Sequence, residues 1–145
     1  FRMNYYDMIL NLFTSFGYFK SERENKDVIR SVAQGLKSGG IFVLDYFNPK
    51  KIVSELKEKE TKTEEGINFS ITRNVNAKFL EKQISVNDKG KMFSFIEHVM
   101  LFSSRELSDC LQNFKLNVID LYGDYSLNQF VEDKSERMIF IAQKT

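Results

Sequence analysis

Polar and aromatic side chains gather where two apolar segments of this sequence end. Asn11, Leu12 and Phe13 close the first segment, and Tyr46 and Asn48 close the second. Ligands of open α/β sheets bind at the carboxyl ends of the strands, so side chains at these positions could hold a ligand. Leu12 and Phe13 could equally belong to the hydrophobic core.

An aromatic loop follows the first segment. Phe16, Tyr18 and Phe19 surround Gly17. Rings at this position could line a substrate pocket, with Phe16 and Tyr18 as the candidates, or could pack the loop against the helix that follows. At the second segment, strand alternation places Tyr46 and Asn48 on one face. One of the two faces is expected to meet a substrate, and the sequence leaves open which.

The elements that position these residues form a strand–helix–strand unit. Tyr5–Phe13 and Ile41–Tyr46 are apolar on successive residues, as in strands covered by helices on both faces. Glu24–Lys37 has the apolar spacing of an amphipathic helix, and Gly39 and Gly40 supply its expected end. The unit predicts two parallel strands joined by a right-handed crossover.

A different pattern follows Pro49, which suits the first turn of a short helix. The charged run 57–60 then leads outward, and Ile67–Phe102 alternates like a three-stranded antiparallel meander. Ser103 begins another helix with a capping box. Asn117–Tyr122 and Arg137–Gln143 read as two final strands, the second apolar enough to be central.

Composition excludes several classes of function. The 21 basic and 20 acidic residues nearly cancel, so the sequence predicts no nucleic-acid partner and no attraction to a membrane surface. No apolar run approaches the ~20 residues of a membrane span. The single cysteine, Cys110, cannot form an internal disulfide, which favours a cytoplasmic setting. With one histidine besides, no metal-ligand spacing is present.

The order of these segments resembles the second half of a class I S-adenosylmethionine-dependent methyltransferase. The similarity rests on 4–49, on the passage 97–107 into a helix, and on the closing segments 122–125 and 135–144. It implies an α/β fold: the C-terminal half of a Rossmann-like sheet, with parallel strands plus one antiparallel strand. Residues 1–58 and 103–145 would form this partial core. Residues 59–102 would be an inserted antiparallel β meander over the substrate.

The resemblance also implies a site. S-adenosylmethionine is the expected cofactor, and a small-molecule nitrogen or oxygen nucleophile is the expected methyl acceptor. Family placement assigns cofactor contact to Asn11, Leu12 and Phe13, acceptor contact to Phe16, Tyr18, Tyr46 and Asn48, and a general base to His98. A lone histidine is more often a structural surface group, so both roles of His98 stay open.

None of the seven glycines forms a glycine-rich cofactor turn before a helix. The sequence is therefore expected to be a fragment of a longer enzyme and inactive alone. A non-catalytic α+β module that binds a ligand or partner remains the alternative. Family topology predicts the strand order 6–13, 41–47, 137–143, 117–122. It leaves segment 4–13 as a bare edge, which predicts a homodimer through that strand.

Overall fold

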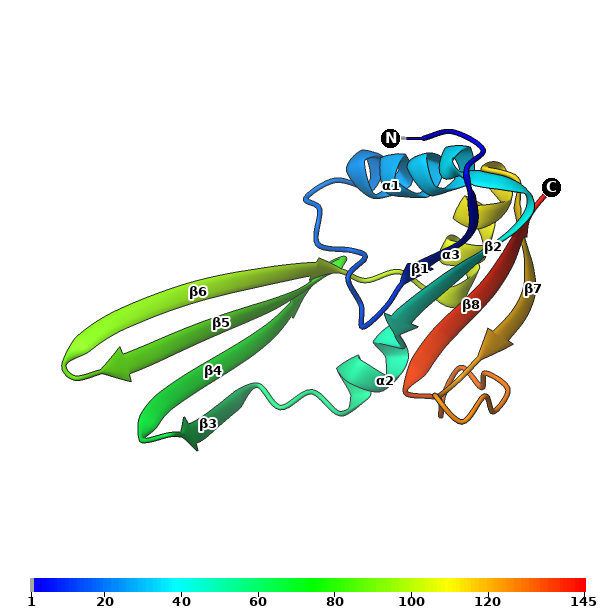
Figure 1. Ribbon diagram of the computed structural model, residues 1–145. Helices are drawn as coiled ribbons and strands as arrows, with labels where there is room; N and C mark the ends of the chain where they lie inside the picture. The colour runs from blue at the N-terminus through cyan, green and yellow to red at the C-terminus, as the bar shows by residue number, and fades with distance from the viewer. Residues whose placement is uncertain (1) are drawn as a thin grey trace.

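The computed structural model describes residues 2–145 and contains two four-stranded sheets (Figure 1). The core sheet has the strand order β1-β2-β8-β7, and the meander, β3-β4-β5-β6, projects away from it. The elements in chain order are β1 (Tyr6–Asn11), α1 (Glu22–Gly35), β2 (Leu36–Phe47), α2 (Pro49–Ser54), β3 (Lys59–Glu64), β4 (Ile67–Asn76), β5 (Phe79–Asp88), β6 (Lys91–Met100), α3 (Ser104–Asn113), β7 (Leu116–Tyr122) and β8 (Arg137–Lys144).

The strand order of the core sheet confirms the prediction from the sequence. β1 runs parallel to β2, and β8 lies antiparallel between β2 and β7. This inner position explains why β8 is apolar on successive residues: Met138, Ile139 and Phe140 are all buried. The last strand of the chain is therefore an interior strand of the sheet.

Helices α1 and α3 pack on β2 and β7 and contact each other, so they share one face of the core sheet. Their buried residues include Ile29 and Leu111, which join a cluster with Phe42 and Phe140 of the sheet. The apolar strands predicted helices on both faces, whereas the two longer helices lie on one.

Between residues 2 and 145, no helix is long and apolar enough to cross a membrane.

Helix α1 begins as predicted but ends earlier. Ser21 and Glu24 form a capping box at its start. The predicted stop at Gly39 and Gly40 is wrong: the helix ends at Gly35, and both glycines lie inside β2. They belong to a bulge that shifts the β1–β2 register, where Gly39 has φ +77°. A Cβ at Gly40 would lie 2.9 Å from the Lys37 carbonyl oxygen, so only glycine fits.

The meander contains the three predicted strands and a fourth that the sequence did not predict. β3 begins at Lys59, within the charged run 57–60 that was expected only to lead outward, and pairs antiparallel with β4. Its residues are Lys, Glu and Thr alone, so it has no apolar alternation to reveal it. Charged residues are common on edge strands because they discourage pairing with further chains.

Candidate functional site

The first strand of the core sheet ends in a tight turn. β1 stops at Asn11 because Phe13 and Thr14 adopt φ values of +56° and +54°, a left-handed conformation that costs non-glycine residues energy. Asp45, near the end of the neighbouring strand, holds the turn. The Phe13 N–H donates to its carboxylate at 2.8 Å, and the Thr14 N–H donates to its backbone carbonyl at 3.1 Å.

Asp45 is the centre of a buried polar network. Its carboxylate is 1% exposed and accepts hydrogen bonds from Arg137 Nε at 2.5 Å and from the Tyr125 hydroxyl at 2.9 Å. Arg137 also donates to Thr14 Oγ1 at 3.0 Å. Partial burial, and then the hydrogen bond to Asp45, raise the pKa of Tyr125. Thr14 Oγ1 also accepts from the Phe47 N–H at 3.2 Å. Two bonds to Asp45 and two to Thr14 Oγ1 therefore hold the turn that follows β1.

The sequence analysis did not foresee this network. The sequence signal that could have indicated the network is a pair of opposite charges, Asp45 and Arg137, within two otherwise apolar strands. Phe47 pairs with Arg137 in the β2–β8 register, which brings Arg137 beside Asp45. Because Asp45 and Arg137 are 92 positions apart in the sequence, their contact could not be predicted without knowledge of that register.

The residues expected to contact the cofactor lie together at this turn. Asn11 is half-buried, and its Oδ1 is buried with no hydrogen-bond partner within residues 2–145. The Leu12 carbonyl accepts from Ser15 Oγ at 2.7 Å, and the Phe13 side chain is 76% exposed. Since the N–H groups of Phe13 and Thr14 are already bonded, the side chains of Asn11 and Phe13 are what this turn offers a ligand.

Two of the residues expected to contact the acceptor are packed in the core. Tyr46 is fully buried and donates its hydroxyl hydrogen bond to the Met100 carbonyl. Burial raises its pKa, so the phenol stays protonated. Phe16 is 2% exposed and packs against Tyr46 and Phe102. Together they fix the base of the meander to the core sheet.

A third, Asn48, caps α2. Its Oδ1 accepts from the Lys50 N–H, and its Nδ2 donates to the carbonyls of Glu132 and Ser135. Tyr18 differs, since half of it is exposed, and its pKa is raised by burial and then by Glu97. Tyr18 is thus the only one of the four predicted acceptor residues with an open surface, and acceptor contact stays a prediction for all four.

His98 lies in the meander, two residues before Met100. Its Nδ1 is 3.6 Å from Glu81 Oε2 on β5, and its side chain is 49% exposed. Glu97, on the opposite face, lies 3.2 Å from Lys82 Nζ. The two neighbours therefore face apart, as adjacent residues of a strand do. The partner of His98 is a meander residue, and its catalytic role stays a prediction.

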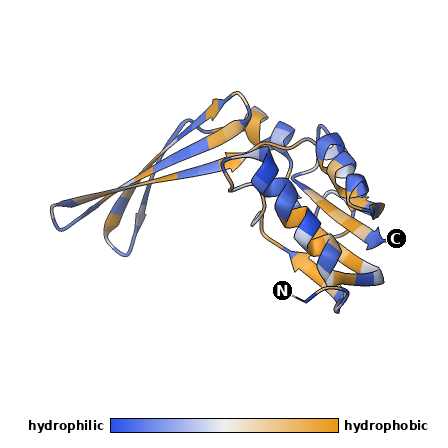
Figure 2. Ribbon diagram, turned by 90° about the horizontal axis from the view of Figure 1, so that it is seen from above, coloured by the Kyte–Doolittle hydropathy of each residue, from blue (hydrophilic) through white to orange (hydrophobic). Residues whose placement is uncertain are grey.

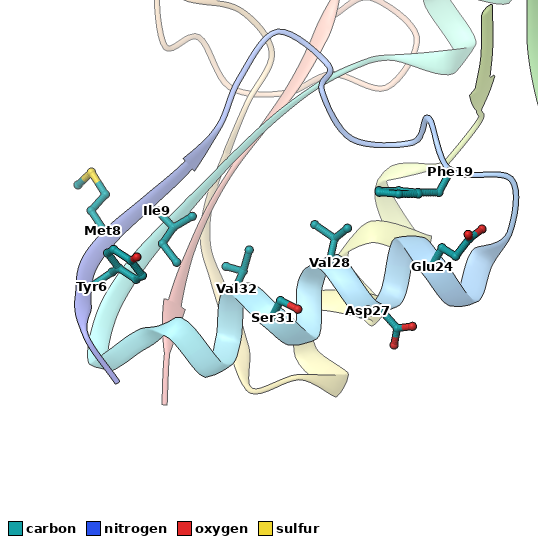
Figure 3. Close-up of a pocket in the computed structure, with 9 residues that line it drawn as sticks. All are labelled: Tyr6, Met8, Ile9, Phe19, Glu24, Asp27, Val28, Ser31 and Val32. Atoms are coloured by element: carbon teal, nitrogen blue, oxygen red, sulfur yellow. The ribbon is translucent and has the colours of Figure 1, made fainter. Parts of the chain in front are cut away.

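A hollow of about 730 Å³ opens between β1 and α1 (Figure 3). Its walls are largely apolar: Ile9 from β1 faces Val28 and Val32 from α1, and Phe19 lies at one end. β1 is the outermost strand of the core sheet, so the hollow lies along an unpaired edge. An apolar surface of this kind on an edge strand is suited to receive further polypeptide.

Several proteins of known structure share this fold. No family model and no curated protein matches the sequence. Solved structures do. An S-adenosylmethionine-dependent methyltransferase from Clostridium acetobutylicum matches 97% of this chain with a TM-score of 0.83 at 19% identity. The CcbJ methyltransferase from Streptomyces caelestis matches 98% with a TM-score of 0.81 at 16% identity.

The chain has the fold of part of an S-adenosylmethionine-dependent methyltransferase. It spans 59% and 62% of the length of those two structures. A third match is CalS10, an amino pentose methyltransferase from Micromonospora echinaspora, with a TM-score of 0.67 at 17% identity over 97% of this chain and 59% of that one. At such identities the likeness concerns the fold. It includes the meander, because nearly the whole chain is matched.

Tyr46 supplies a test of how the two sheets of this fold are joined. Replacing Tyr46 with phenylalanine should lower the free energy of unfolding by about 1–3 kcal/mol, because the buried Met100 carbonyl loses its donor. Urea unfolding followed by circular dichroism would measure the change. The matched control is Tyr18→Phe, a half-exposed tyrosine whose substitution should stay within about 0.5 kcal/mol. Equal effects would contradict the anchoring role.

Proposed function

We propose that this chain forms the acceptor-side part of an enzyme that transfers a methyl group from S-adenosylmethionine to a small-molecule nitrogen or oxygen nucleophile. The observation that carries the proposal is the match of 97% of the chain, core sheet and meander together, to a methyltransferase of that class. The amino pentose methyltransferase among the matches favours an amine acceptor. The unmatched two-fifths of those structures would supply the rest of the cofactor site.

Asn11, Leu12 and Phe13 are proposed to hold the methionine portion of the cofactor. The cofactor would supply a methyl group activated by a sulfonium. Its ammonium group is a hydrogen-bond donor, and the buried Asn11 Oδ1 is an acceptor that lacks a donor within residues 2–145. Asp45 and Arg137 would act indirectly, by holding the turn that presents these residues.

Acceptor binding is proposed for the rim beside this turn. Tyr18 would contact the acceptor directly. The other candidates, which have less support because their side chains are buried, are Phe16, Tyr46 and Asn48. His98 would take the proton that an amine or hydroxyl loses, a contribution of roughly 10²–10⁴-fold in rate. Methyl transfer needs mainly alignment of the two reactants and exclusion of water, so few catalytic groups are required.

The experiment uses the full-length protein that the gene encodes. Incubation with methyl-labelled S-adenosylmethionine and a panel of amino sugars and phenols should transfer label to one acceptor class. His98→Asn should lower kcat, while Asn11→Leu should raise the KM for the cofactor with a smaller effect on kcat. A full-length protein that neither binds the cofactor nor transfers label would favour the non-catalytic α+β binding module instead.

The bare edge of β1 supports a prediction about the isolated chain. We propose that the 145-residue chain self-associates through segment 4–13 as a two-fold dimer, because β1 offers unpaired backbone groups beside an apolar hollow. Met8 on this strand is 55% exposed. Met8→Lys should shift the particle mass in light scattering toward the monomer. Ile119→Lys on β7, the opposite edge strand, is the control. A wild-type chain that stays monomeric when concentrated would contradict the proposal.

A further inference from the structure

Tyr125 lies beside the turn that follows β1, although it belongs to the loop between β7 and β8. Its hydroxyl donates to Asp45 Oδ2 at 2.9 Å, and the same oxygen accepts the Phe13 N–H at 2.8 Å. The hydroxyl is therefore fixed at the turn, while the residue as a whole is 60% exposed. An aromatic ring that is held by one polar atom and is open elsewhere can contact a ligand.

The loop that carries this ring is tightly bonded. Asp124 Oδ1 accepts from the N–H groups of Ser126 and Asn128 at 2.9 and 3.1 Å. The Gly123 N–H donates to the Asn128 carbonyl at 2.7 Å, and a Cβ at Gly123 would lie 2.1 Å from Ser135 Oγ. The loop therefore has little freedom to move, as is required of an element that positions a ligand.

The ring of Tyr125 already attracts one cation. The Arg137 guanidinium carbon lies 5.3 Å from the ring centroid, within the range of a cation–π contact. Arg137 is also ion-paired with Asp45, so its charge is compensated. Because Tyr125 is 60% exposed, the guanidinium covers no more than one face of the ring. The other face is open to a second cation.

A cavity of about 290 Å³ opens beside the ring, with Phe47 and Ile52 among its lining residues. Pockets for whole ligands have roughly 300–1,000 Å³, so this cavity is suited to one group of a ligand. The meander projects away from the core sheet, and the loop 123–136, orange in Figure 1, lies on the far side of the core from it (Figures 1 and 2). The meander therefore leaves the cavity open.

The surroundings of the cavity are negatively charged. Its two cationic lining residues are each ion-paired with a carboxylate. Two further carboxylates line the cavity, and hydrogen bonds from Asn128 lower the pKa of one of them, Asp124; the other is Glu136. All charged residues of 45–55 and 123–137 together have a net charge of −2. The cavity therefore favours a cation over an anion.

We propose that Tyr125 and this cavity form a subsite for an organic cation. The open face of the ring supplies a cation–π contact, and the two carboxylates supply the opposite charge. For the source of the cation, the inference rests on the proposed function. The source is either the sulfonium of S-adenosylmethionine or the ammonium form of an amine acceptor. The turn proposed to hold the cofactor lies directly beside Tyr125.

The first test uses tetramethylammonium as the probe and tert-butanol as a neutral molecule of similar size. In an NMR titration of the full-length protein, the amide signals of residues 123–128 should respond to the cation at roughly 2- to 30-fold lower concentration. Tyr125→Leu should lose this preference, because it removes the ring and keeps an apolar side chain. Tyr125→Phe should keep it. Both variants lose the hydrogen bond to Asp45, so their difference reports the ring alone.

Leu127→Ala is the matched control, because Leu127 lies on the same loop and is 59% exposed. This variant should keep the preference for the cation. Circular dichroism should show all three variants folded. Equal responses of the wild-type protein to the two probes, or an unchanged preference in Tyr125→Leu, would overturn the proposal.

The second test identifies the cation. If the cation is the sulfonium, Tyr125→Leu should weaken binding of S-adenosylmethionine by roughly 2- to 30-fold in calorimetry. Binding of the neutral product S-adenosylhomocysteine should stay nearly unchanged. If the cation is the ammonium, the variant should raise the KM for amine acceptors and leave the KM for phenols and both cofactor affinities unchanged.

Neither effect in Tyr125→Leu would overturn the assignment of the subsite to methyl transfer. Failure of the proposed function gives a different result. A wild-type protein that prefers tetramethylammonium but transfers no methyl group would contradict the proposed function and support the cation subsite.

Discussion

Replacing Arg137 with methionine should lower the free energy of unfolding by about 3–5 kcal/mol, because it leaves a charged carboxylate buried without its partner. Asp45 is 1% exposed, so water cannot take over the role of the guanidinium. The turn after β1 also loses the Arg137 bond to Thr14 Oγ1. Chemical denaturation followed by circular dichroism would measure the loss.

The control is Lys37→Met, which breaks an ion pair with Asp7 on the surface of the same sheet. Both side chains are well exposed, at 49% and 83%, so this change should cost at most about 1 kcal/mol. A double variant, Asp45→Asn with Arg137→Met, should be less destabilised than Arg137→Met alone because no buried charge remains. If Arg137→Met and Lys37→Met cost the same, the network does not hold the turn.

The isolated chain should bind S-adenosylmethionine at least about 1,000-fold more weakly than the full-length protein does. A Kd of 1 μM corresponds to roughly −8 kcal/mol and 1 mM to roughly −4 kcal/mol. We attribute the difference to adenosine and ribose contacts, for which this chain has no glycine-rich turn before a helix. What remains is the turn carrying Asn11 and Phe13.

Isothermal titration calorimetry on the two proteins would check this expectation. Asn11→Leu in the full-length protein is the companion variant, and it should weaken binding without affecting thermal stability. Low-micromolar binding by the 145-residue chain would show that the cofactor site lies wholly within it and would overturn the division proposed here.

The sequence predicted the core sheet well because its signals are strong and consistent. Arg137–Gln143 is apolar on successive residues, and that pattern required an inner position, which β8 has. The end of α1 was misjudged because two glycines usually terminate a helix, whereas here they form a bulge beside β1. β3 was missed because its charged residues carry no apolar periodicity.

The candidate site was less predictable than the fold. Alternation placed Tyr46 and Asn48 on one face, but it could not tell that Tyr46 is buried in the core and that Asn48 caps α2. Polar residues at strand ends can bind ligands or cap a neighbouring helix. The same residue types do both, so residue type alone does not distinguish the two roles. The contact between Asp45 and Arg137 depends on a register that only the folded sheet establishes.

The inner position of β8 has a consequence for biosynthesis. The meander is built from hairpins between neighbouring segments, whereas β2 must await β8, whose Arg137 lies 92 positions after Asp45. At elongation rates of ~5–20 residues per second, β8 leaves the ribosome on the order of 5–20 s after β2. During that interval the apolar strand Leu36–Phe47 has only β1 as a partner in its sheet. The nascent protein is therefore expected to depend on chaperones at this stage, with the meander formed before β8 completes the core sheet.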